Sequence, residues 1–200
     1  MTTTGTAAYD GSTDLPPLVA AAVAAARSAG FEYSCLPEQG RLLQVLAAGV
    51  GAGVIGETGT GYGVGLAWLA SGAHPDARLI SVERDPARAE AAAQVFADDS
   101  RVQVRCGEWT KLSQEAPFDL LVLDGGGQGK ADEPPLDPGD WLQPGGLVVL
   151  DDFTPMTSWP PIFDGQPDTA RVYWMSHPRL RAAEVRVTPA AAAIVATYLG

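Results

Sequence analysis

Four short apolar runs, each ending at an acidic residue, constrain the fold of this chain most strongly. They are GVIGE at 53–57, ARLISVE at 77–83, FDLLVLD at 118–124 and GGLVVLD at 145–151. Runs of Val, Ile and Leu of this length are typical of strands that are buried on both faces of a parallel sheet. Helix-like segments lie between them, which predicts right-handed β-α-β crossovers with helices on both sides.

Helix signals precede and separate these runs. A first helix is expected from Asp14, acting as its cap, with prolines 16 and 17 in the first turn and Gly30 just beyond its end. A second should begin near Pro37. The clearest helix follows the second run, where Asp85 is the expected cap and Pro86 the first helical residue.

The last part of the chain has a different pattern. The segments AEVRVT at 183–188 and AAAIVATYL at 191–199 are both strand-like, and only a turn around Pro189 separates them. With no room for a helix between them, they predict an antiparallel hairpin at the edge of the sheet.

Length and charge narrow the function classes. The chain has 200 residues, which predicts a flexible N-terminus at 1–13 and a single domain at 14–200. Acidic residues outnumber basic ones 24 to 13, giving a net charge of −11. That charge argues against binding to nucleic acid or to anionic membranes, but it allows a small cationic substrate. The N-terminus lacks a signal-peptide pattern and no early apolar run could span a bilayer, so a cytoplasmic protein is expected.

A glycine-rich turn, GETGTGYG at 56–63, follows the first run. It matches neither G-x-G-x-x-G nor the phosphate-binding loop. The carboxylate of Glu57 would repel a phosphate, whereas it would attract a sulfonium or an amino group. Glu83, 26 residues later at the end of the next run, is expected to accept the hydroxyls of a ribose. The predicted ligand is therefore a nucleoside with a cationic, amino-acid-like tail, and S-adenosylmethionine has that form.

Five motifs in order carry a resemblance to a known family: GETGTGYG, VERD, CGEW, FDLLVLDGG and LQPGGLVVLDDF. They resemble the successive motifs of class I S-adenosylmethionine-dependent methyltransferases, and among these the catechol and caffeoyl-coenzyme A O-methyltransferase group. The resemblance implies a Rossmann-like, doubly wound, seven-stranded and mostly parallel sheet with an antiparallel C-terminal strand. It also implies methyl transfer from S-adenosyl-L-methionine to a small-molecule acceptor, and a hydroxyl oxygen is the expected position of transfer.

The resemblance assigns the cofactor to residues at the strand ends. Glu57, Gly59 and Gly61 would line its methionine part, Glu83 would take the ribose hydroxyls, and Trp109 would form a flat wall beside the adenine. The full set of predicted cofactor-binding residues is Glu57, Gly59, Thr60, Gly61, Gly63, Glu83, Arg84, Gly107, Glu108, Trp109 and Asp124.

The resemblance also implies a divalent cation such as Mg²⁺, held by Asp124, Asp151 and Asp152. Asp152 replaces the asparagine of the resembled group. That group usually places a lysine shortly after the acid that ends the fourth strand. Gly127 occupies that place here, and Lys130 follows three residues later. Asp124 and Lys130 are therefore the candidate catalytic residues.

Two functions other than methyl transfer stay open. One rival is a cofactor-binding protein without catalysis, which the missing lysine and the altered third metal ligand leave open. The other is an NAD-dependent oxidoreductase, against which the absent G-x-G-x-x-G counts.

The segment 152–174 is expected to be an irregular loop leading into a short helix. Its four aromatic residues, Trp159, Phe163, Tyr173 and Trp174, could form an acceptor pocket or the contact of a homodimer.

Overall fold

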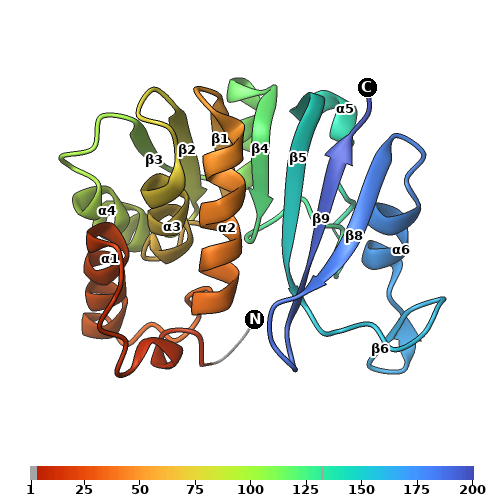
Figure 1. The fold of residues 1–200 in the computed structure, drawn as a ribbon, viewed down its shortest axis with the longest axis horizontal. Helices are drawn as coiled ribbons and strands as arrows, with labels where there is room; N and C mark the ends of the chain where they lie inside the picture. Colours follow the sequence, from red (N-terminus) through yellow and green to blue (C-terminus); the bar gives the residue numbers. More distant parts are fainter. Residues whose placement is uncertain (1–3, 132) are drawn as a thin grey trace.

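A seven-stranded sheet forms the centre of the computed structural model, which describes residues 4–131 and 133–200 (Figure 1). The strand order is β3-β2-β1-β4-β5-β9-β8. The strands are β1 (Val54–Thr58), β2 (Arg78–Glu83), β3 (Val102–Cys106), β4 (Phe118–Leu123), β5 (Leu142–Phe153), β8 (Leu180–Arg186) and β9 (Ala192–Tyr198). Strands β1 to β5 pair in parallel, and β9 runs antiparallel to both β5 and β8. The predicted sheet and its terminal hairpin are confirmed, with β8 at the edge and β9 inside.

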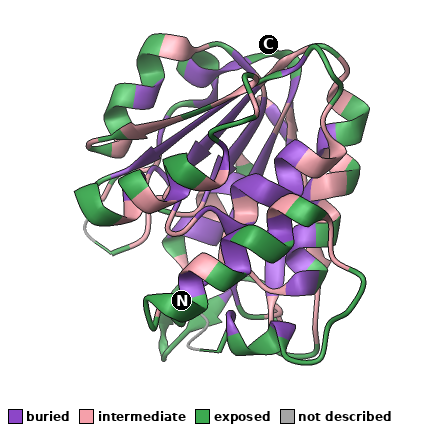
Figure 2. Ribbon diagram, turned by 90° about the vertical axis from the view of Figure 1, so that its left-hand side faces the viewer, coloured by how far each residue is buried: buried purple, intermediate pink, exposed green. Residues whose placement is uncertain are grey.

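Helices cover both faces of the sheet, as predicted for a doubly wound fold. On one face, α1 (Pro17–Ser28), α2 (Pro37–Val50) and α3 (Val64–Gly72) share a core with the sheet, and α4 (Pro86–Val95) lies beside them. The second core, on the opposite face, contains side chains of η2 (Trp109–Glu115), α5 (Pro138–Trp141) and α6 (Thr169–Ser176). Figure 2 shows the resulting layers, with buried residues along the strands and on the inner sides of the helices.

A capping side chain sets the first residue of α4, whereas a proline sets the first residue of α1. Asp85 caps α4 as predicted, because its Oδ1 accepts hydrogen bonds from the amides of Ala87 at 2.9 Å and Arg88 at 3.0 Å. The prediction that Asp14 caps the first helix was wrong. A residue before proline avoids the helical region, so Pro16, which precedes Pro17, is extended with ψ 143° and α1 begins only at Pro17.

The N-terminal segment contributes to the core. The single turn η1 (Ala7–Tyr9) places the Tyr9 ring in the core, and the Tyr9 hydroxyl accepts a hydrogen bond from Trp68 Nε1 at 2.9 Å. The same hydroxyl donates to the carbonyl oxygen of Cys35 at 2.9 Å. The chain from Thr4 to Thr13 lies in the stretch expected to be flexible, and Tyr9 within it is buried. Residues 1–3 of that stretch lie outside the described part.

The segment after β5 contains a small hairpin that was not predicted, formed by β6 (Ile162–Phe163) and β7 (Gln166–Pro167). The short helix expected after it is α6. Its N-cap, Asp168, accepts a hydrogen bond from the Arg171 amide at 3.0 Å. No helix in the described residues has the length and apolar character needed to cross a membrane.

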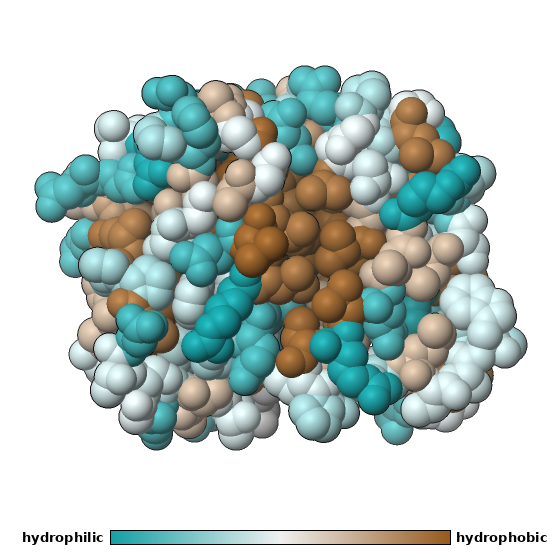
Figure 3. Space-filling view, viewed as in Figure 1, coloured by the Kyte–Doolittle hydropathy of each residue, from teal (hydrophilic) through white to brown (hydrophobic). Residues whose placement is uncertain are grey.

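Apolar side chains gather in the middle of the face shown in Figure 3, over α2 and the strands next to it. On that face α1 to α3 cover one half of the sheet, while no helix in the described chain lies in front of β5, β9 and β8 (Figure 1). Val45 of α2 is 69% exposed. Leu46 of α2, Leu147 of β5 and Val195 of β9 are only partly buried in the same core.

Candidate functional site

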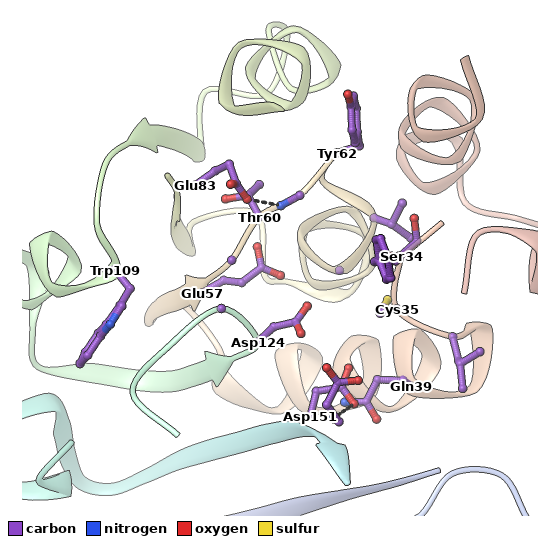
Figure 4. Close-up of a pocket in the computed structure, with 18 of the residues that line it drawn as sticks. Ser34, Cys35, Gln39, Glu57, Thr60, Tyr62, Glu83, Trp109, Asp124 and Asp151 are labelled. Atoms are coloured by element: carbon purple, nitrogen blue, oxygen red, sulfur yellow. Dashed lines mark hydrogen bonds between the residues drawn. The ribbon is translucent and has the colours of Figure 1, made fainter. Parts of the chain in front are cut away.

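A cavity of about 700 Å³ opens at the carboxyl ends of the parallel strands. This is the edge at which open α/β sheets bind their ligands. Its lining comes from the turn after β1, the ends of β2, β4 and β5, and the segment before α2. Figure 4 shows Glu57, Asp124 and Asp151 near its middle, with Trp109 on one side and Cys35 on the other. Glu57, Asp124 and Asp151, which are far apart in the sequence, thus meet in one site.

The glycine turn after β1 has most of its backbone N–H groups occupied. The amides of Gly59 and Thr60 donate to the carbonyl oxygen of Val82, at 2.9 and 3.4 Å, and the amide of Gly61 donates to Glu83 Oε2 at 2.8 Å. A Cβ on Gly59, whose φ is +86°, would stand 2.5 Å from the Cα of Gly125. The glycine therefore allows the ends of β1 and β4 to touch, and the turn is built on protein contacts and not as a cradle for phosphate.

Glu57 is a buried carboxylate that lines the cavity, with 2% of its surface exposed. Ser81 Oγ donates to its Oε2 at 2.6 Å, and Thr60 Oγ1 lies 2.5 Å from Ser81 Oγ. Burial raises the pKa of Glu57 to about 7, the Ser81 hydrogen bond opposes that shift and the charge of Glu83 adds to it. No salt bridge to Glu57 occurs within the described part of the chain. The site thus presents a desolvated anion that a cationic ligand would stabilise.

Glu83 and Trp109 line the end of the cavity that lies away from Cys35 (Figure 4). Glu83 Oε1 accepts from the Asp85 amide at 2.9 Å, so both carboxylate oxygens are held in place and each retains lone pairs for a ligand. Trp109 packs against Trp141 of α5, with ring centroids 5.6 Å apart, and its Nε1 donates to Glu133 Oε1 at 2.5 Å. Glu133 thereby fixes the indole as a wall of the cavity.

Asp124 directly follows β4, and Asp151 lies where the regular part of β5 ends. The pairing of β5 with β9 is irregular between Leu150 and Phe153, and Asp152 there has a φ of +61°. Burial and then the charges of Asp151 and Asp152 raise the pKa of Asp124, and Glu57 adds to the shift. Burial, followed by the charge of Asp152, also raises the pKa of Asp151 to about 6. These carboxylates are therefore close enough to repel one another electrostatically.

Lys130 lies next to these carboxylates but is fixed by backbone contacts. Its Nζ donates to the carbonyl oxygens of Asp151 at 2.7 Å and Asp152 at 2.8 Å, and it stands 4.0 Å from the centroid of the Phe153 ring. Burial lowers its pKa, while the neighbouring carboxylates oppose that change. Gln128 holds the same loop by donating from Nε2 to the Leu123 carbonyl oxygen. The lysine thus joins the β4 loop to the end of β5.

The structure brings together nearly all of the predicted site residues. Those that line the cavity are Glu57, Gly59, Thr60, Gly61, Glu83, Arg84, Gly107, Glu108, Trp109, Asp124, Asp151 and Asp152. Gly63 and Lys130 do not line it: Gly63 caps α3 and packs against the Phe96 ring. Of the four aromatic residues expected near an acceptor, Phe163 lines the cavity, whereas Trp174 is fully buried in the core.

The prediction of a metal site is not matched by a ligand group in this arrangement. Among residues 4–131 and 133–200, no three His, Cys, Asp or Glu side chains are placed so as to hold a metal ion. Asp124, Asp151 and Asp152 influence one another's charge, but they do not converge as ligands. Metal binding by them stays a prediction.

The segment before α2 is the main part of the cavity wall that sequence reasoning missed. It contributes Tyr33, Ser34, Cys35 and Leu36, and Gln39 follows in the first turn of α2. The sequence predicted a helix from about Pro37 but no contribution to the cavity, because the contacts that bring this segment to the site are tertiary. Tyr9 holds the Cys35 carbonyl oxygen, and Gly40 lies so close to the Trp68 indole that a Cβ there would stand 2.1 Å from Nε1.

Comparison with known proteins finds similarity to methyltransferases. Residues 57–153 match the family model described as a methyltransferase domain. A catechol O-methyltransferase of Niastella koreensis is 35% identical over 149 residues, which cover 67% of this chain and 64% of that protein. A catechol O-methyltransferase of Mycobacterium tuberculosis is 34% identical over 115 residues, covering 54% of this chain and 52% of that protein. The chain thus spans less than two thirds of the length of these curated relatives.

Solved structures show the same fold. The O-methyltransferase TomG of Streptomyces achromogenes, in complex with SAM, superposes with a TM-score of 0.72 at 20% identity, covering 98% of this chain and 96% of that one. An O-methyltransferase of Bacillus cereus in complex with SAH also gives 0.72 at 20% identity, covering 98% of both chains. The resemblance predicted from the sequence is confirmed: residues 57–153 match the model of a methyltransferase domain, and the chain is similar to proteins named O-methyltransferase and catechol O-methyltransferase.

Proposed function

We propose that this protein transfers a methyl group from S-adenosylmethionine to a hydroxyl of a small-molecule acceptor. One observation carries the proposal: Glu57, a buried carboxylate without a cationic partner among the described residues, lines the cavity beside a glycine turn. A ligand with a sulfonium and an ammonium group supplies the missing positive charge. The structural relatives solved with SAM and SAH support the same cofactor.

The occupied amides of the glycine turn favour this cofactor over a dinucleotide. A pyrophosphate needs free N–H groups at the turn, and Gly59, Thr60 and Gly61 donate theirs to Val82 and Glu83. Glu57 would also repel a pyrophosphate. The NAD-dependent alternative is therefore disfavoured on the geometry of the turn as well as on its sequence.

The proposed reaction is an in-line displacement for which the protein supplies position and charge. The acceptor oxygen forms a bond to the methyl carbon while the carbon–sulfur bond breaks, which turns the sulfonium into a neutral thioether. The hydroxyl proton passes to Asp124, which lines the cavity and whose pKa is raised by burial, so that it is a stronger base than an exposed aspartate. Alignment of donor and acceptor provides the remaining rate acceleration.

A methyl-transfer assay tests the proposal. The protein is incubated with S-adenosylmethionine carrying a labelled methyl group and with a panel of small phenols and amines. Labelled product from a hydroxyl-bearing acceptor is the expected result. Cofactor binding without turnover across the panel would favour the alternative of a cofactor-binding protein without catalysis.

We keep divalent-metal assistance as a further proposal, because a cation would relieve the repulsion among Asp124, Asp151 and Asp152. The side chains would have to reorient to become ligands. If the metal acts, EDTA should reduce turnover strongly, added Mg²⁺ should restore it, and Asp151→Ala should be insensitive to both. Equal rates with and without EDTA, together with an unimpaired Asp151→Ala variant, would remove the metal from the mechanism.

We also propose a homodimer and a cytoplasmic location, as expected from the sequence. The candidate contact is the apolar surface formed by Leu46, Leu147 and Val195, together with the exposed Val45 of the same helix as Leu46. In the described part of the chain no helix covers that half of the sheet face (Figures 1 and 3). Sedimentation should show a dimer for the unmodified protein and a monomer for Val45→Asp. A monomer at every concentration of the unmodified protein would contradict this.

A further inference from the structure

Gln39, in the first turn of α2, is a buried polar side chain that the proposed chemistry does not use. Only 1% of its surface is exposed, and it lines the cavity. Neither Oε1 nor Nε2 of its amide has a hydrogen-bond partner in the described part of the chain. Buried polar groups in proteins are nearly always hydrogen-bonded, so an amide with both atoms unpaired points to a partner that comes from outside the chain.

The position of Gln39 is set by packing that leaves α2 little freedom. Gly40, the next residue, lies against the Trp68 indole, which therefore holds the first turn of α2 on α3. Trp68 donates to the Tyr9 hydroxyl, and Tyr9 donates to the carbonyl oxygen of Cys35 just before the helix. The backbone that carries Gln39 is thus held in place before any ligand arrives, as the support of a binding group should be.

Gln39 lies at the acceptor end of the cavity and not at the cofactor end. Figure 4 shows it beside Asp151, with Asp124 between this pair and Glu57. The sheet order agrees, because β5, which carries Asp151, is separated by β4 from β1 and its glycine turn. A cofactor that spans Glu57 and Glu83 extends over β1 and β2, which leaves the space over β4 and β5 for the acceptor.

We propose that Gln39 anchors the methyl acceptor through two hydrogen bonds, one accepted by Oε1 and one donated by Nε2. The acceptor it fits is neutral and carries a donor and an acceptor side by side, as a primary carboxamide does. An anionic acceptor is disfavoured because Asp124, Asp151 and Asp152 line the same end. Leu36, Phe153 and Phe163 supply apolar surface for the body of such a molecule.

This inference rests on the proposed methyl transfer, and Gln39→Met tests it separately. Methionine keeps the unbranched shape and removes both unpaired polar atoms, so the melting temperature of the free variant should rise, on the order of 4 °C. The control Gln94→Met changes an exposed glutamine of α4 in the same way and should leave the melting temperature nearly unchanged.

The functional readout uses 3,4-dihydroxybenzamide as the neutral probe and 3,4-dihydroxybenzoate as its anionic counterpart. In Gln39→Met, KM for the benzamide should rise about tenfold or more, kcat should change less, and the Kd for S-adenosylhomocysteine should stay as in the unmodified protein. The unmodified protein should prefer the benzamide to the benzoate, and Gln94→Met should behave like it.

The outcomes separate this inference from the function on which it rests. A lower melting temperature for Gln39→Met, or an unchanged KM for the benzamide, would overturn the role of Gln39 while leaving methyl transfer intact. Failure of the unmodified protein to bind S-adenosylhomocysteine would instead overturn the proposed function. A raised Kd for S-adenosylhomocysteine in Gln39→Met would assign the amide to the cofactor and also overturn the inference.

Discussion

Glu57→Lys is expected to reduce the affinity for S-adenosylmethionine by about 100-fold or more, equivalent to about 3 kcal/mol. The substitution places an ammonium where a buried carboxylate faces the cavity, so an attraction to the cationic ligand becomes a repulsion. The matched control is Glu90→Lys, which reverses an exposed charge on α4 and should change the affinity little. Calorimetric titration of both variants measures the difference, and equal affinities would show that Glu57 does not face the ligand.

Glu57→Gln provides a second test for the case in which the lysine variant fails to fold. Glutamine keeps the shape and can still accept the hydrogen bond from Ser81. Because the pKa of Glu57 is about 7, the affinity of the unmodified protein for S-adenosylmethionine should rise between pH 6 and pH 8 as the carboxylate ionises. The glutamine variant should bind more weakly and lose that part of the pH dependence. An identical pH profile in both proteins would contradict the assignment.

The same pKa predicts how stability without cofactor varies with pH. Below about pH 4.5 Glu57 is protonated in both the folded and the unfolded chain, so it contributes nothing to the pH dependence. Between 4.5 and about 7 only the unfolded chain ionises, and the free energy of unfolding falls as pH rises. Above that range the loss is complete, on the order of 3 kcal/mol. Denaturant unfolding at pH 8 should therefore find Glu57→Gln more stable than the unmodified protein, and the gap should close toward pH 4.

Lys130→Met is expected to lower the free energy of unfolding by about 2–4 kcal/mol at pH 7, because it removes two charge-assisted hydrogen bonds. Those bonds join the loop after β4 to the carbonyl oxygens of Asp151 and Asp152. The positive charge of Lys130 lowers the pKa of Asp124, so that pKa should rise further when the ammonium is removed. Denaturant unfolding measures the first effect.

A matched variant and a kinetic measurement decide what Lys130 does. Lys111→Met removes an exposed lysine of η2 and should change stability by well under 1 kcal/mol. If Lys130 positions the end of β5, Lys130→Met should lose both stability and activity, because Asp151 and Asp152 are no longer held in place. A variant as stable as the unmodified protein, with normal S-adenosylhomocysteine binding but no turnover, would show that Lys130 takes the substrate proton instead.

The strands and the acidic residues at their ends could be predicted because both depend on local sequence. Runs of Val, Ile and Leu define β1, β2, β4 and β5, and in a parallel sheet their carboxyl ends must share one edge. Glu57, Glu83 and Asp124 therefore had to come together once the topology was right. Asp85 was also readable, since a cap acts within its own turn.

The features that sequence reasoning missed depend on contacts between distant segments. Nothing near Gln39 indicates that its amide will be buried, because that follows from the packing of Gly40 on Trp68. Tyr9 falls in a polar N-terminus, yet Trp68 and Cys35 draw it into the core. The spacing of Lys130 from Asp124 could not show whether its ammonium reaches a substrate or the carbonyl oxygens of β5.

The most direct test of the central claim is a pair of calorimetric titrations of the unmodified protein, one with S-adenosylmethionine and one with NADH. The account predicts saturable binding of S-adenosylmethionine, weakened about 100-fold or more in Glu57→Lys, and no measurable binding of NADH. Saturable binding of NADH, with no heat from S-adenosylmethionine, would contradict the assignment of the cavity to a cationic nucleoside cofactor.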